Sequence, residues 1–148
     1  MTDKQILVLN KIVETCQAVT GIVYAGLYPD NKHDIGQNFP AVLVEDGNES
    51  APTYNAGQEV IYDYQVTIRL YHELRLTNRI QDILSLQNKL LTAIITDLSL
   101  SGLVQIITGH SVDKGISYDD LPEGGAGYQS EITARNININ MKIKDTRQ

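Results

Sequence analysis

The sequence predicts one α+β domain, with two helices packed on one face of a sheet of about five strands. Two segments carry apolar residues at helical spacing, and five others carry the alternation or the β-branched runs of strands. They follow one another as helix, three strands, helix, two strands. This order lacks regular strand-helix alternation, so the sheet is expected to be largely antiparallel or mixed. We find no linker within residues 1–148, a length typical of one domain.

The first helix is expected over the first eighteen residues or so, up to Gly21. Thr2 and Gln5 fit a capping box at its start. The apolar residues that recur at spacings of three and four are Ile6, Leu9, Val13 and Cys16. Cys16 is the single cysteine, which excludes an intrachain disulfide, and its place on the apolar face predicts a buried thiol rather than a nucleophile.

Three strands are expected next, over residues 22–28, 41–45 and 60–72, with a polar loop before the third. In the third strand the even positions are apolar or tyrosine, and most odd positions are polar. This alternation predicts a strand with one face on the core and one face in water.

The second helix is expected between Asn78 and Leu98, a stretch without glycine or proline. The residues predicted at the centre of its apolar stripe are Ile80, Ile83, Leu84, Leu91, Ile94, Ile95 and Leu98. Leu86 and Leu90 fall on the flank of that stripe and widen the apolar arc to about half the circumference. An arc of this width exceeds what one sheet face usually covers, which favours contact with another subunit.

Two further strands are expected over residues 103–108 and 136–143. In the last strand Asn136, Asn138 and Asn140 alternate with apolar residues, so they form either a plain solvent face or a hydrogen-bonding surface covered by another subunit. Residues 118–127 between these strands are rich in glycine and acid and predict a mobile loop.

Charge and composition limit the classes of partner. The net charge of −6 and pI near 4.9 oppose attraction to phosphate backbones and anionic lipid, so we expect neither nucleic acid nor membrane as a partner. No apolar run approaches the length of a membrane span, and the first residues lack the pattern of a secretory signal, so we expect a protein made and kept in a cytoplasm.

The sequence carries no motif for catalysis, metal or cofactor. His33, His72 and His110 lie in separate segments, without metal-ligand spacing. The acidic residues that could gather oxygens for calcium are Asp113, Asp119, Asp120 and Glu123. Their order departs from that of an EF-hand loop, and no nucleophile elbow or phosphate-binding loop is present. We therefore expect no enzyme, no metal and no cofactor.

The segment Asp97–Val104 reads Asp-Leu-Ser-Leu-Ser-Gly-Leu-Val and joins the second helix to an extended run. With the order of elements over nearly the whole chain, it resembles the tail terminator and minor tail proteins of long-tailed bacteriophages. In those proteins a turn with a sequence similar to Leu-x-Gly-Leu-Val often joins the second helix to the next strand. The resemblance therefore implies that Ser101–Val104 is this turn, with a structural role only.

The resemblance implies a subunit of a ring, commonly a hexamer, that caps the tail tube and offers the surface on which the head docks. Its partners would be copies of itself, the tail tube protein and a head-completion or connector protein. It would lie in the virion tail after assembly in the bacterial cytoplasm, and it would have no active site.

Subunit contacts are expected from the pattern of the residues themselves. Tyrosine suits half-wet contact surfaces, and Tyr62, Tyr64 and Tyr71 crowd one strand, although ordinary core tyrosines would give the same pattern. The residues hypothesised to lie in an interface are Tyr62, Arg69, Leu86, Leu90, Asp119 and Asp120.

Three other functions remain open at this point. The first is another neck or head-closure component. The second is an adaptor module unrelated to phages, with a ligand pocket near Tyr62, Tyr64 and the second helix. The third is a metal-dependent enzyme that uses the acidic loop and a histidine.

Overall fold

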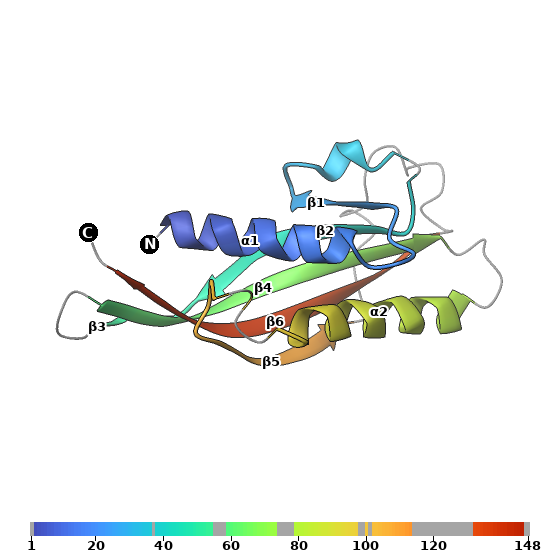
Figure 1. Ribbon diagram of the computed structural model, residues 1–148. Coiled ribbons are helices and arrows are strands. Elements are labelled where there is room, and N and C mark those ends of the chain that lie inside the picture. The colour runs from blue at the N-terminus through green and yellow to red at the C-terminus, as the bar shows by residue number, and fades with distance from the viewer. Residues whose placement is uncertain are drawn as a thin grey trace.

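The computed structural model describes residues 2–36, 38–54, 59–73, 79–97, 100, 102–113 and 132–146. Two helices, α1 (Thr2–Gln17) and α2 (Arg79–Ile95), lie on one face of a twisted sheet (Figure 1). We call this the helix face, and the opposite side of the sheet the polar face. The α+β class and the placement of both helices agree with the sequence prediction.

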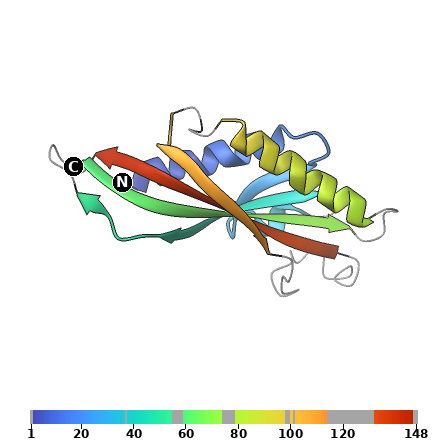
Figure 2. The ribbon, with the colours of Figure 1, turned by 90° about the horizontal axis from the view of Figure 1, so that it is seen from below.

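The sheet contains six strands in the order β1-β2-β4-β6-β5, with β3 paired to β4. Their bounds are β1 Tyr24–Tyr28, β2 Ala41–Glu49, β3 Thr53–Tyr54, β4 Glu59–Glu73, β5 Ile106–Asp113 and β6 Ile132–Thr146. Only β1 and β2 run parallel; the other pairs are antiparallel. β4 and β6 pair along their full length and form the centre of the sheet, whose twist Figure 2 shows from below.

The strand bounds differ from the predicted ranges in several places: β1 begins at Tyr24 rather than at residue 22, and β6 extends over Ile132–Thr146 rather than 136–143. β2 continues past Glu45 to Glu49, and the segment predicted as a polar loop contains the short strand β3. β5 begins at Ile106 rather than at residue 103, because the chain is still turning there: Leu100 and Gly102 both have positive φ, 48° and 87°. Leu103 and Val104 therefore belong to the turn.

The main core lies between the helices and the sheet. Val8, Ile12 and Cys16 of α1 pack with the even residues of β4 and the odd residues of β6 from Ile137 to Ile143. Cys16 is fully buried, as predicted. Burial raises the pKa of its thiol to about 12, so it stays protonated at neutral pH.

A second, smaller core lies on the polar face, at the end of the sheet next to β1. Its buried residues are Ile35, Ala41, Leu43, Tyr71 and Ala134. The chain between β1 and β2, which includes the 3-10 helix η1 (Lys32–Asp34), supplies Ile35 and Phe39 to it. The prediction of a wet face for β4 is therefore right at Asp63 and wrong at Arg69 and Tyr71, both of which are buried.

The buried side of α2 is rotated from the predicted one. Leu86 and Leu90, predicted on the flank, are 7% and 0% exposed, whereas Leu84 and Ile95, predicted at the centre, are 38% and 39% exposed. Leu86 lies next to Gly21, just beyond α1. Because α2 packs on α1 as well as on the sheet, its buried side turns toward α1.

Candidate functional site

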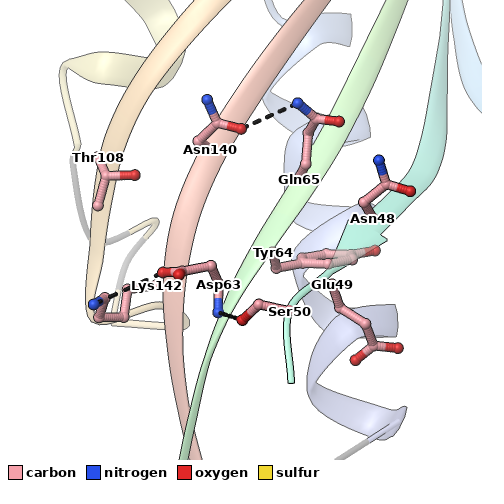
Figure 3. A pocket seen from close by; sticks show the side chains of 9 residues that line it. All are labelled: Asn48, Glu49, Ser50, Asp63, Tyr64, Gln65, Thr108, Asn140 and Lys142. Carbon is pink, nitrogen blue, oxygen red and sulfur yellow. Dashed lines mark hydrogen bonds and ion pairs between the residues drawn. The ribbon is translucent and has the colours of Figure 1, made fainter. Parts of the chain in front are cut away.

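A groove of about 570 Å³ crosses the polar face of the sheet (Figure 3). Side chains from β2, β4, β5 and β6, together with Ser50, line it, and most of them are amides, hydroxyls or charged groups. They are Asn48, Glu49, Ser50, Asp63, Tyr64, Gln65, Thr108, Asn140 and Lys142. The groove is therefore a site for polar contacts.

The floor of the groove consists of cross-strand pairs of β4 and β6. Gln65 stands opposite Asn140 and donates to its Oδ1 over 3.2 Å, and Asp63 stands opposite Lys142, with 3.7 Å between Oδ1 and Nζ. Such directly opposed pairs stabilise a sheet by up to about 1 kcal/mol each. Asp63 and Lys142 are about half exposed, so this ion pair contributes little to folding and stays accessible to a partner.

The rim of the groove on the β2 side is formed by an irregularity in the pairing with β4, between Asp46 and Glu49. Gly47 lies there so close to β4 that a Cβ would overlap the carbonyl oxygen of Gln65. Beyond the irregularity, the Asp63 N–H donates to Ser50 Oγ over 2.9 Å. Glycine thus allows the close approach that sets the rim.

Tyrosines and carboxylates meet behind this rim. The Tyr64 hydroxyl donates to Asp46 Oδ1, and Gln5 Nε2 donates to Glu49 over 3.0 Å and to the Tyr62 hydroxyl over 3.2 Å. Burial raises the pKa of both phenols, and the hydrogen bond to Asp46 raises that of Tyr64 further. Both therefore act as neutral hydrogen-bonding groups at ordinary pH.

The predicted asparagine row lies on the polar face, where it joins three strands. Thr67 donates to Asn138 Oδ1 over 2.9 Å. The amide of Asn138 donates to Ser111 Oγ over 3.3 Å and to Asp113 Oδ2 over 3.0 Å. Part of the hydrogen-bonding capacity of the row is thus used within the sheet.

The hypothesised interface residues do not form one surface. Tyr62, Leu86 and Leu90 belong to the main core, so their side chains leave almost no area for another subunit. Arg69 lies on the opposite face, 8% exposed; it donates to Glu45 over 2.8 and 3.1 Å and stacks 3.7 Å from the centre of the Tyr28 ring. Asp119 and Asp120 lie outside the described residues.

The sequence placed Leu84, Leu91 and Ile95 on the apolar side of α2, but it did not predict that this side is partly exposed. Leu84, Gln87, Leu91 and Ile95 follow one another at helical spacing along one side of the helix, which we call the α2 stripe. Arg135 of β6 donates to Gln87 over 3.2 Å, whereas Asp82 and Leu86 border a pocket near Gly21 on the α1 side. The α2 stripe therefore faces β6 and the edge strand β5 beyond it.

The two edges of the sheet are treated differently. On the outer edge of β1, the Ala25 N–H donates to Gln17 Oε1 over 3.0 Å and the Leu27 N–H donates to Asn31 Oδ1 over 2.9 Å. β5 is the other edge strand, and no group among the described residues bonds its outward N–H and C=O groups. We call these groups the open edge of β5.

Metal-ligating residues are scattered across the described part of the chain, where no three His, Cys, Asp or Glu residues stand close enough to hold an ion. His33 and His110 are exposed at distant places and His72 is buried in β4. Neither helix in the described ranges is long and apolar enough to cross a membrane.

Comparison of the sequence with protein-family models and with curated proteins finds no match.

Proposed function

We propose that this chain is a structural assembly subunit, and specifically a tail terminator of a long-tailed phage or prophage. It would form a hexameric ring that caps the tail tube and joins it to a head-completion or connector protein. It would reside in the virion tail after assembly in the host cytoplasm. The support for the specific role is the resemblance in element order and in the turn after α2.

The observation that carries an assembly role is the uncovered surface along α2 and β5. Leu84 and Ile95 are more than a third exposed on the α2 stripe, on the helix face, and Ile106 is 44% exposed on the polar face of β5, where it stands opposite Lys142. Exposed apolar side chains near an unpaired strand are surfaces that another protein can cover. The net charge of −6 makes nucleic acid an unfavourable candidate for that role.

The groove supports a second candidate, a binding or adaptor module. Its volume suits a small ligand, and its rim carries donors and acceptors from four strands. It lies on the polar face, away from α2, and Tyr64 borders it whereas Tyr62 does not. Another neck or head-closure component would share the assembly surface and differ only in its partners.

Electron microscopy of negatively stained protein, alone and mixed with tail tubes built from the tube protein of the same genome, tests the proposal. Rings of about six copies, in solution or at tube ends, and arrest of tube growth are the expected results. Absence of rings in both samples, with tubes that keep growing, would refute the terminator role. Saturable binding of a small molecule in the groove under those conditions would favour the adaptor module.

A further inference from the structure

We propose that the open edge of β5 docks a second copy of this chain, so that two β5 strands pair antiparallel about a twofold axis. The inference goes beyond the proposed function and does not rest on it. It starts from the difference between the two sheet edges and from the charge at one end of β5.

The outer edge of β1 is already hydrogen-bonded, so β1 is a poor partner for a strand of a second copy. Gln17 and Asn31 already accept the outward N–H groups of Ala25 and Leu27, so another strand would have to displace both side chains. Among the described residues β5 has no such protection: its eight residues include neither lysine nor proline, and its one acidic residue, Asp113, is at its end. β3, the remaining edge strand, has only two residues, so edge pairing between copies joins β5 to β5, and such a contact is symmetric.

The faces of β5 give the register. Its pairing with β6 is irregular between Ile107 and Gly109, so the regular part is Gly109–Asp113. Gly109, Ser111 and Asp113 stand opposite asparagines of β6 and share the polar face. Pairing about Ser111 keeps these residues on the same face in both copies, and it sets Gly109 opposite the second copy's Asp113.

Charge favours this antiparallel direction. Lys142 and Lys144, on β6 near the start of β5, already pair with Asp63 and Glu59 of β4 over 3.7 and 2.6 Å. The direction therefore depends on Asp113: antiparallel pairing places the two Asp113 carboxylates at opposite ends of the junction. Parallel pairing would place the two Asp113 carboxylates side by side, which is unfavourable.

The α2 stripe lies on the same side of the molecule as the strand that would pair. A twofold axis perpendicular to the sheet keeps both α2 helices on the helix face of the combined sheet. Because Gln87 of the α2 stripe bonds to Arg135 of β6, the strand next to β5, the exposed Leu84 and Ile95 lie on the side of α2 that is turned toward the new junction. The stripes would then add apolar contact to the strand pairing.

The twofold β5–β5 dimer and a ring that caps the tail tube cannot form through the same contact. The two ends of a twofold pair are identical, whereas a ring between tube and head has two different faces. A subunit held at β5 by a second copy must therefore separate before it enters such a ring. Pairing at β5 would limit ring formation away from the tube.

Two substitutions at one position test the charge argument. Gly109 has no atom within 4 Å of an added Cβ, and its φ is not in the left-handed region, so Gly109→Lys and Gly109→Glu both fit. Sedimentation equilibrium should show a concentration-dependent dimer of the unmodified chain. The dimer dissociation constant of Gly109→Glu should be roughly tenfold higher than that of Gly109→Lys, from two symmetric pairs with Asp113. The difference should shrink at high salt.

A cysteine at the twofold axis locates the contact. Ser111→Cys would meet its own copy across the junction, at a separation suited to a disulfide, and mild oxidation should give a covalent dimer. Ser85→Cys, exposed on α2, is the matched control and should remain monomeric on a denaturing gel. The buried Cys16 should not react in either protein.

Each outcome separates this inference from the proposed function. A monomer at the highest attainable concentration, equal dimerisation of the Lys and Glu variants, or no crosslink at Ser111→Cys would overturn the inference. Rings formed directly from free subunits, with no dimer, would also overturn it while supporting the terminator. A β5-linked dimer that never yields rings would leave the inference standing and refute the terminator.

Discussion

The two faces of the sheet are buried by different means. On the helix face, α1 and α2 cover one continuous core that reaches from Val60 near one end of β4 to Leu70 near the other. On the polar face, the chain between β1 and β2 is the one covering segment among the described residues, and the small core under it has five buried residues at one end of the sheet. β4 therefore behaves as a half-buried strand near Asp63 and as a fully buried one near Tyr71. The contribution of each face to the free energy of folding therefore depends on what covers it: two helices on the helix face and a loop on the polar face.

Truncation on the helix face should have the largest effect. Leu90→Ala removes a fully buried side chain between α2, α1 and the sheet, and should lower the free energy of unfolding by about 3 kcal/mol. Leu84→Ala, at an exposed position on the same helix, should cost less than about 1 kcal/mol. Urea denaturation followed by circular dichroism measures both. Equal losses would mean that the buried side of α2 is misplaced.

Truncation on the polar face should cost less for the same chemistry. Leu43→Ala also removes a fully buried leucine, but the loop carrying Ile35 and Phe39 can move inward and reduce the cavity. We expect a loss of about 2 kcal/mol. The exposed Val23→Ala serves as the control in the same urea titration. A loss as large as that of Leu90→Ala would show that the small core is as rigid as the main one.

The smallest expected effect concerns the dependence of stability on pH. The Cys16 thiol has a pKa raised to about 12 by burial, whereas it titrates near 8.5 once unfolded. Above that value the unfolded chain loses a proton that the folded chain keeps, so stability falls as pH rises. The slope is about 1.4 kcal/mol per pH unit per thiol. Between about pH 9 and 10, the free energy of unfolding should fall by about 1.4 kcal/mol less for Cys16→Ala than for the unmodified chain, because the variant lacks this thiol. Identical slopes would contradict the burial of Cys16.

The sequence predicted the elements well because periodicity records local burial. The even positions of β4 and the Asn-Ile alternation of β6 correspond to observed faces. The predicted face of α1 is only partly right: Cys16 is buried, but Ile6 is 50% exposed, and the other fully buried residues are Val8 and Ile12. Boundaries were predicted less well where long-range contacts decide them. β2 extends to Glu49 because β4 is long enough to pair with it, and β5 starts late because Gly102 is still in a turn.

The candidate surfaces were harder to predict because they depend on how elements pack. Projection of α2 gave a wide apolar arc, but the side next to α1 could not be known, so Leu86 was assigned outward and Leu84 inward. Arg69 was read as a surface residue because its partners, Glu45 and Tyr28, are distant in sequence. The open edge of β5 follows from strand order, which no local pattern contains.

The small core on the polar face has a consequence for the motions of the molecule. Among the described residues between Tyr28 and Ala41, Ile35 is the one fully buried residue, and Phe39 packs against the small core. Segments with so little buried apolar area open at a lower free energy than the whole domain. Amide hydrogens there should exchange with solvent through partial opening while β4 and β6 keep full protection. The domain would then unfold in at least two steps, starting from this loop.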